Sequence, residues 1–371
     1  MAAAMASTQV RPRTKVPSRS KAVRRMMGNR NRRRCRDDDA DGGARHNGRV
    51  LRLIATDLDG TLLRSDRETV SARSRAALKR AIDAGIAIVL VSARGPGGVT
   101  AIADGLSIDG LAICSNGAIV CDLATGETIR HRPLASEVGA AIIRKLRERL
   151  PDVCFAAETE AVIACEPSFK GAWDGWELPD DTVYGDALEL VATPVTKLIA
   201  RDAGRSIEEL AAAAREVAGE AAAVTVSGEW VIEILAAGVN KAAALEELAN
   251  ILGVQAEEVV AFGDYPNDLP MLAWAGRSIA PANAHPEVLT SVDRITASND
   301  DDGVAIAIEE LLAQAETTVP SRLDSGPRAL TDLRHSAPDR RQRTIEGQSE
   351  AAPSYGDVMP VTPWGAVPVN P

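Results

Sequence analysis

Aromatic residues are scarce in this chain of 371 residues, since Phe, Trp and Tyr together make up 3% of it. Hydrophobic residues still reach 45%, so a sizeable core must be built from Ala, Val, Leu and Ile. The sequence also lacks any uninterrupted apolar run close to the ~20 residues that a membrane-spanning helix needs. We therefore expect a globular protein with an aliphatic core and no membrane partner.

Cysteine and histidine are few and scattered. The five cysteines are odd in number and form no C-x-x-C pair, which argues against a disulfide framework and against a zinc site. The four histidines include no pair at the spacing of metal ligands. This usage is typical of free thiols in a reducing compartment, and we predict a cytoplasmic location.

The formal charge of -10 is unevenly distributed, because residues 1–48 are strongly basic and the remainder is acidic. An acidic body argues against nucleic acid as a partner of the core. We expect 1–48 to be a disordered basic tail, although a targeting segment or a start placed too early would leave the same pattern. Its basic run 30–36 could touch nucleic acid or lipid, or only be solvated. Residues 317–371 lack periodicity and are predicted to be disordered too.

Short apolar runs alternate with helical patterns in the first half of the chain. The runs 50–55, 86–91 and 111–114 read as strands, with helical segments after the first and second. Strands that are apolar throughout are typical of a parallel sheet covered by helices on both faces. The sequence therefore predicts an α/β fold with a Rossmann-like doubly wound sheet.

The pattern becomes less regular after the third run. Thr125-Gly126 marks the turn of a hairpin, and a mixture of helices and short strands follows. Ser206 and Glu209 predict one helix with a capping box at its start. We interpret this part of the chain as an α+β module inserted between βα units.

Parallel α/β character returns near Lys241. We therefore predict a core domain from residues 49–132 and 237–316, with an inserted α+β cap domain at 133–236. In open α/β sheets ligands bind at the carboxyl ends of the strands, so the cleft between core and cap is the expected position of an active site.

Polar groups follow the predicted strands at those ends. They are Asp57 and Asp59, Ser92, Asn116, Gly263-Asp264 and, at a helix start, Lys241. Burying acids is costly unless a cation or a reaction uses them. Carboxylates suit Mg²⁺, which proteins usually bind beside a phosphate. A hydroxyl and an ammonium suit the phosphate itself, so the set predicts phosphoryl transfer.

The order and spacing of these residues resemble the motifs of the haloacid dehalogenase-like phosphatases. The four motifs are matched by Asp57-Leu58-Asp59-Gly60-Thr61, Ser92, Lys241 and Gly263-Asp264-x-x-Asn267-Asp268. Further stretches resemble the Cof-type group, which has a large inserted cap of type IIB. These are Ser115-Asn116-Gly117-Ala118, Gly238-Val239-Asn240-Lys241, Asn283-Ala284-His285-Pro286 and Ser298-Asn299-Asp300. The resemblance covers about residues 50–313.

The resemblance implies a role for each matched residue. Asp57 would attack phosphorus and form an aspartyl-phosphate. Asp59 would protonate the leaving alcohol and then activate water, and an acid two residues along an extended strand points to the same side. Ser92 and Lys241 would bind the oxygens of the transferring phosphoryl group.

The resemblance also implies Mg²⁺ as the cofactor. Asp57, the backbone carbonyl of Asp59 and Asp264 would hold the ion, and Asp268 would support it through water or an outer contact. Asn267 would orient Asp264 or Lys241. Thr61 is a further candidate for a supporting contact.

Five candidates keep two interpretations. Arg94 could contact substrate or phosphate, or only form an ion pair, while Asn116 and Asn283 could contact substrate or only hold their turns. Trp173 and Trp176, in the expected cap, could stack on a substrate ring or only pack the cap.

Two positions depart from the family pattern. Ala93 stands where the family has Gly, and Ala242 follows the lysine where Gly is frequent. Ala93 removes the backbone freedom of glycine. Neither change removes a catalytic group, so we expect an active enzyme.

The leading hypothesis is a Mg²⁺-dependent phosphomonoesterase acting on a small phosphorylated metabolite. The resemblance suggests sugar phosphates, flavin mononucleotide or pyridoxal phosphate as substrate classes. The alternatives are a phosphotransferase or phosphomutase on the same fold, and a catalytically silent binding protein that uses the basic tail. The sequence names neither the substrate nor the oligomeric state.

Overall fold

The computed structural model describes residues 45–46, 49–160, 162–171, 182–228 and 230–317 of the chain. Trp173, Trp176 and the basic run 30–36 lie outside them, as does nearly all of both predicted tails. Within the predicted N-terminal tail, Arg45–His46 forms strand β1, which pairs with β2 (Arg49–Val50).

The larger of two main sheets has eight strands, with the order β16-β15-β14-β3-β4-β5-β6-β7. Neighbouring strands from β16 to β5 are parallel, and β6 and β7 add an antiparallel hairpin at one edge. The predicted doubly wound parallel sheet is confirmed. The strands are β3 Leu53–Asp57, β4 Ala87–Val91, β5 Leu111–Cys114, β6 Ile119–Asp122, β7 Thr128–His131, β14 Val259–Phe262, β15 Arg277–Pro281 and β16 Arg294–Thr296.

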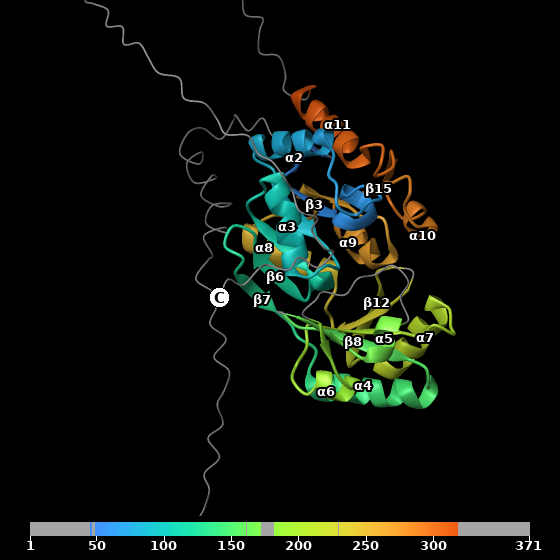
Figure 1. Cartoon of the computed structure of the whole chain (residues 1–371). Coiled ribbons are helices and arrows are strands. Elements are labelled where there is room, and N and C mark those ends of the chain that lie inside the picture. The colour runs from blue at the N-terminus through green and yellow to red at the C-terminus, as the bar shows by residue number, and fades with distance from the viewer. Residues whose placement is uncertain (1–44, 47–48, 161, 172–181, 229, 318–371) are drawn as a thin grey trace, which may run out of the picture.

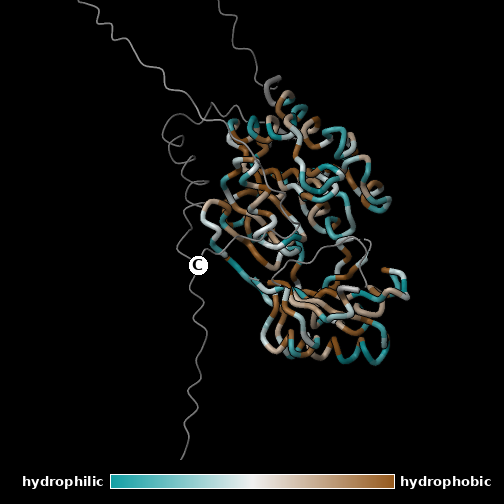
Figure 2. Tube along the Cα trace, viewed as in Figure 1, coloured by the Kyte–Doolittle hydropathy of each residue, from teal (hydrophilic) through white to brown (hydrophobic). Residues whose placement is uncertain are grey.

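Helices cover both faces of this sheet. Ile54 on β3 belongs to the hydrophobic cluster on one face of the sheet, and its neighbours Leu53 and Ala55 belong to the cluster on the other face. Successive strand residues point to opposite faces. Figure 1 shows α2 and α11 on one side of β3 and α8 and α9 on the other. The helices are α2 Ala72–Asp83, α3 Pro96–Leu106, α8 Lys241–Leu252, α9 Leu269–Trp274, α10 Pro286–Leu289 and α11 Gly303–Thr317. Figure 2 shows hydrophobic segments concentrated along the strands between these helices.

The smaller sheet has six strands in the order β10-β9-β8-β11-β13-β12, all antiparallel to their neighbours except β10 and β9. Its strands are β8 Cys154–Glu158, β9 Ile163–Cys165, β10 Val183–Tyr184, β11 Lys197–Arg201, β12 Ala222–Val226 and β13 Ile232–Ala236. Its helices are α4 Ser136–Arg149, α5 Pro167–Gly171, α6 Ala187–Leu190 and α7 Ile207–Ala218. The predicted capping box is present at the start of α7, where Ser206 and Glu209 exchange side-chain to backbone hydrogen bonds.

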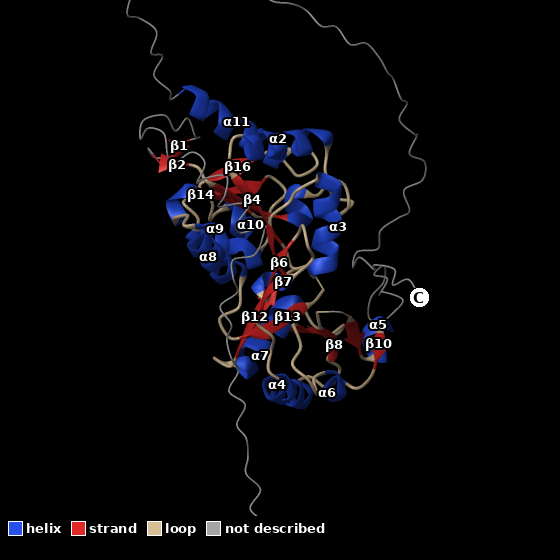
Figure 3. Ribbon diagram, turned by 90° about the vertical axis from the view of Figure 1, so that its left-hand side faces the viewer, coloured by secondary structure: helices blue, strands red, loops and turns tan. Residues whose placement is uncertain are grey.

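One face of the smaller sheet packs on α4, α6 and α7, and the other packs on α5 and faces the larger sheet. Phe155, Leu198 and Ile234 lie in the cluster that packs with α4, α6 and α7. Leu235, on the alternate face of β13, packs instead with Ala118 of the larger sheet's hairpin region. Figure 3 shows the smaller sheet between α4, α6 and α7 on one side and the larger sheet on the other.

The chain passes between the two sheets at residues 132–135 and again at residues 237–240. The larger sheet takes its strands from both sides of the segment 133–236, and the smaller sheet takes all of its strands from within it. The division into a core and a cap domain at these boundaries stays a prediction. No described helix is both long and apolar enough to cross a membrane.

Candidate active site

The site begins at the carboxyl end of β3, whose five residues are all buried. The strand ends at Asp57, which is 5% exposed, and the chain then turns through η1 (Leu58–Leu62). The turn needs Gly60, which has a φ of 75°, in the left-handed region that glycine tolerates. A Cβ on Gly60 would lie 2.4 Å from Asp264 Oδ2. The expectation that Asp57 and Asp59 share one extended strand is therefore wrong, because the chain leaves the strand at Asp57.

A buried lysine pairs with this strand end. Lys241 is the first residue of α8, and its Nζ lies 2.6 Å from Asp57 Oδ1 and 2.6 Å from Asp268 Oδ1. Burial lowers the pKa of Lys241, but the attraction of Asp268 and Asp57 outweighs it and holds the pKa above its usual range. The ammonium therefore stays charged in the middle of the site.

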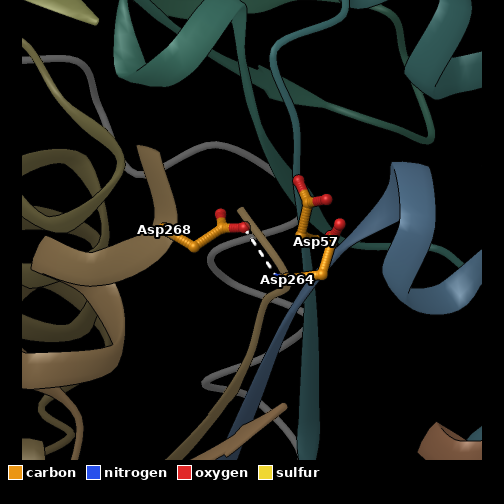
Figure 4. A group of neighbouring side chains, drawn as sticks. All are labelled: Asp57, Asp264 and Asp268. Carbon is orange, nitrogen blue, oxygen red and sulfur yellow. Dashed lines mark hydrogen bonds between the residues drawn. The ribbon is translucent and has the colours of Figure 1, made fainter. Parts of the chain in front are cut away.

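Two further carboxylates come from the loop after β14. Asp268, the last residue of η4 (Pro266–Asp268), accepts hydrogen bonds at Oδ2 from the backbone N–H groups of Asp264 and Tyr265, both at 3.1 Å. Thr61 Oγ1 donates to Asp264 Oδ1 at 2.6 Å. Burial, and next the charge of Asp268, raise the pKa of Asp264 to about 7. Figure 4 shows the side chains of Asp57, Asp264 and Asp268 gathered at one place.

This cluster has the donor set of a site for a hard cation. Each of Asp57, Asp264 and Asp268 offers an oxygen within 4.8 Å of the others. Burial outweighs the attraction of Lys241 and raises the pKa of Asp57 well above its usual range. The single positive charge of Lys241 does not balance the three buried carboxylates, and a cation would offset the remaining negative charge. Asp268 already binds the ammonium and two backbone N–H groups, so Asp57 and Asp264 are better placed as direct ligands.

Asp59 lies apart from the metal cluster and pairs with Arg94. Arg94 Nε and Nη2 lie 2.8 Å and 2.5 Å from the two carboxylate oxygens of Asp59, and Nη2 also donates to the carbonyl of Arg67 at 2.7 Å. The structure therefore shows Arg94 in an ion pair, one of its two interpretations. With its side chain engaged in this way, Asp59 would offer a metal ion its backbone carbonyl, and that role stays a prediction.

Ser92 follows β4 and is fully buried. Its Oγ accepts the backbone N–H of Arg94 at 3.0 Å, which leaves the hydroxyl proton for another acceptor. Asn283 Nδ2 donates to the carbonyl of Gly60 at 2.8 Å, and Asn283 Oδ1 accepts the N–H of Asn299 at 2.9 Å. Asn283 thus holds the turn that carries Asp59, which was its second interpretation.

Asn116 and Asn267 connect this site to the smaller sheet. Asn267 Nδ2 donates to Asn116 Oδ1 at 3.0 Å, and Asn116 Nδ2 donates to Glu233 of β13. Sequence reasoning missed Glu233 and two other buried charges of the smaller sheet, Glu158 and Lys197. The available signal was a single charge inside an otherwise apolar strand, as in Val231-Ile232-Glu233-Ile234-Leu235.

The model of the family of haloacid dehalogenase-like hydrolases matches residues 54–308. The chain belongs to this family. A relative of this hydrolase is the 5-amino-6-(5-phospho-D-ribitylamino)uracil phosphatase YwtE of Bacillus subtilis, which is 33% identical over 289 residues, with 71% of this chain and 99% of the relative covered. The prediction of a haloacid dehalogenase-type phosphatase agrees with that relative's name.

Solved structures give the same fold. A haloacid dehalogenase-like hydrolase from Bacteroides thetaiotaomicron is 29% identical, with a TM-score of 0.58, and the match covers 70% of this hydrolase and 99% of that chain. A subclass IIB sugar phosphatase, BT4131, has a TM-score of 0.61 at 21% identity, with coverage of 70% and 98%, and shows the fold alone. The predicted family and fold class are therefore confirmed.

Replacing Lys241 by methionine is expected to lower the free energy of unfolding by about 3–5 kcal/mol, because Asp57 and Asp268 lose their buried counter-charge. In EDTA the loss of unfolding free energy should be larger at pH 8 than at pH 6. The carboxyl groups of Asp57 and Asp268 avoid an unpaired buried charge only by taking up protons, which they do more readily at the lower pH. Urea unfolding at both pH values measures it. Lys79→Met on the exposed side of α2 is the control, with an expected change below about 1 kcal/mol. An equally small change in Lys241→Met would contradict the buried pairing.

Proposed function

We propose that this hydrolase is a Mg²⁺-dependent phosphomonoesterase that acts on small phosphorylated metabolites through an aspartyl-phosphate. The observation that carries the proposal is the position of Asp57, at a buried strand end between the Lys241 ammonium and Asp264. A carboxylate held beside a fixed positive charge and a cation site can attack a phosphate that brings its own negative charge. We also propose that residues 133–236 form the cap over this site.

The residues divide the reaction between them. An oxygen of Asp57 bonds to phosphorus as the bond to the leaving oxygen breaks, and Asp59 gives that oxygen its proton. Water then attacks phosphorus, Asp59 takes the water proton, and the carboxylate of Asp57 is released with inorganic phosphate. Ser92 and Lys241 bind the phosphoryl oxygens throughout.

Mg²⁺ fits the remaining donors. Asp57, Asp264 and the backbone carbonyl of Asp59 would hold the ion, and Asp268 would fix the surrounding groups from outside. When bound, Mg²⁺ supplies positive charge that offsets the phosphoryl oxygens and the buried carboxylates.

The chemistry of the site and the name of the relative support the proposed substrate class. Nothing in the reaction described above needs more of the substrate than a phosphomonoester and a leaving oxygen. The Bacillus subtilis relative is named for a 5-phospho-D-ribityl compound. We propose phosphomonoesters of polyols and sugars as the first compounds to test, followed by flavin mononucleotide and pyridoxal phosphate.

Hydrolysis of p-nitrophenyl phosphate tests the activity, and a panel of phosphorylated metabolites tests the substrate class. We expect EDTA to stop the reaction and added Mg²⁺ to restore it. Activity that survives chelation would contradict the metal requirement. With labelled substrate, label should appear in inorganic phosphate, and label on a second sugar would instead identify a phosphotransferase.

The affinity for Mg²⁺ is expected to fall about tenfold for each pH unit below about 7, because protons then compete for Asp264, whose pKa is about 7. A carboxyl with a pKa raised above its usual value of 3.8 favours folding in its protonated form. The metal-free protein should therefore lose stability as the pH rises from about 4 to about 7, and Mg²⁺ should restore it. Calorimetric titration of Mg²⁺ between pH 5.5 and 8 measures the affinity, and a flat profile would contradict the assignment. Asp264→Asn should bind Mg²⁺ weakly and without this pH dependence.

A further inference from the structure

Two loops of the larger sheet are joined into one unit beside the active site. Residues 92–95 follow β4 and residues 115–117 follow β5; together we call them the double loop. The backbone N–H of Ser115 donates to the carbonyl of Arg94 at 2.8 Å, and the N–H of Asn116 donates to the carbonyl of Ser92 at 3.0 Å. A shift of one loop therefore moves the other, and both Ser92 and Arg94 move with them.

Two residues of the double loop have a left-handed backbone conformation. Ser115 and Asn116 have φ values of 49° and 54°. Residues with a side chain adopt this left-handed region rarely, and such strain persists only where the surroundings impose it. The backbone bonds to Arg94 and Ser92 support this turn from within the double loop, and side-chain contacts from outside it add to that support.

Three buried charges of the smaller sheet supply those contacts. Glu158, Lys197 and Glu233 lie on the neighbouring strands β8, β11 and β13, and are 3%, 0% and 4% exposed. Lys197 Nζ lies 2.5 Å from Glu233 Oε1 and 3.2 Å from Glu158 Oε2. We call these three residues the charged triplet. Alternation along the strands places them on the face directed at the larger sheet, opposite the face that packs on α4 and α7.

Each member of the charged triplet also bonds to the double loop. Lys197 Nζ donates to the carbonyl of Ala93 at 2.8 Å. Ser115 Oγ donates to Glu158, and Asn116 Nδ2 donates to Glu233. Glu158 and Glu233 thus bind the side chains of the two strained residues, Ser115 and Asn116. Lys197 binds the backbone of Ala93, the residue after Ser92.

These bonds link the docking of the smaller sheet to the shape of the double loop. Two carboxylates and one ammonium buried together leave one negative charge without a counter-charge, so the carboxylates need further donors. The Ser115 hydroxyl donates to Glu158, and the Asn116 amide donates to Glu233. If the sheets separate, water must replace these donors, and the strained turn loses its support. Contact with the charged triplet therefore helps to hold the observed shape of the double loop, together with the backbone bonds of the loop and the bond from Asn267 to Asn116.

We propose that the charged triplet is a positioning device that sets the double loop, and through it places the Ser92 hydroxyl and the Arg94 guanidinium for the reaction. Lys197 is its central positioning residue and touches neither phosphate nor leaving group. The inference rests on the proposed function, which assigns Ser92 to the phosphate and assigns the proton transfer to Asp59, the ion-pair partner of Arg94.

The test is Lys197→Met, with Lys145→Met on the exposed side of α4 as the control. Two substrates are compared at a temperature where each variant is folded: p-nitrophenyl phosphate, and acetyl phosphate, whose leaving group is too small to reach the smaller sheet. Positioning of the phosphate site predicts a loss of at least tenfold in kcat for both substrates, in similar proportion. A loss confined to p-nitrophenyl phosphate would mean contact with the leaving group and would overturn the inference. So would values of kcat within twofold of wild type.

Binding of inorganic phosphate to the Mg²⁺-loaded protein, measured by calorimetry, gives a readout that needs no turnover. Lys197→Met should weaken it at least tenfold, and Lys145→Met should not. A wild-type protein that binds phosphate but hydrolyses nothing contradicts the proposed function, while the loss in Lys197→Met still decides the inference. A wild type that neither binds nor hydrolyses overturns both.

If Lys197→Met does not fold, Glu233→Gln takes its place, because it keeps the shape and an acceptor for Asn116 and removes only the charge beside Lys197. A smaller but parallel loss with both substrates supports the inference, and unchanged kcat and unchanged phosphate affinity overturn it.

Discussion

Replacing Asp57 by asparagine is expected to abolish phosphatase turnover, with a loss of about 10⁴-fold or more. The amide has nearly the same shape and can still accept a hydrogen bond from Lys241, but it cannot form the bond to phosphorus. The substitution should not destabilise the fold. Burial, outweighing the pull of Lys241, raises the pKa of Asp57, so the ionised carboxylate is held at a cost that the neutral amide does not incur. We expect the metal-free variant to be as stable as wild type or more so.

Acid quenching after mixing with labelled substrate measures the phosphoenzyme directly. Wild type should carry acid-stable, base-labile label, and Asp57→Asn should carry none. Asp83→Asn, on the exposed side of α2, makes the same chemical change away from the site and should leave label and rate intact. Label on Asp57→Asn equal to that on wild type would show that another residue is the nucleophile.

The catalytic end of the larger sheet could be predicted because its signals are local. An apolar run followed by acids places Asp57 at a strand end, and parallel strands bring their ends to one edge of the sheet. Ser92 and Asp264 arrive at the same edge for the same reason. Lys241 needs only the helix start that follows Asn240, whose side chain caps α8. Each of these positions depends on one strand or one helix and its immediate turn.

The contacts between the two sheets could not be predicted in the same way. Glu233 lies inside an apolar strand, and such a pattern indicates that the charge is buried but does not identify its partner. The partner, Asn116, is 117 positions away in the sequence, and the two meet only because β13 faces the double loop. The pairing of Arg94 with Asp59 likewise depends on how two loops are docked. Pairings of this kind follow from tertiary packing, which periodicity and spacing do not specify.

Asp59→Asn is expected to separate the two chemical steps that Asp57→Asn removes together. Asp59 lies outside the metal cluster, with its carboxylate held by both ends of the Arg94 guanidinium. Asparagine keeps one of these bonds but can neither give nor take a proton. General acid–base catalysis is worth about 10²–10⁴-fold, so alkyl phosphates, whose leaving oxygen needs a proton, should react slower by that factor. p-Nitrophenolate leaves without a proton, so formation of the phosphoenzyme from p-nitrophenyl phosphate should be affected much less.

Breakdown of the phosphoenzyme still needs a base for water, whichever substrate formed it. Asp59→Asn should therefore release a burst of about one p-nitrophenolate per active site and then turn over slowly, with labelled phosphate accumulating on Asp57. Stopped-flow absorbance together with acid quenching measures both phases, and Asp104→Asn on the exposed side of α3 is the control. A steady-state rate near that of wild type would show that water is activated elsewhere. The absence of both burst and label would show that every substrate needs Asp59 in the first step. The separate roles proposed for Asp57 and Asp59 would then be wrong.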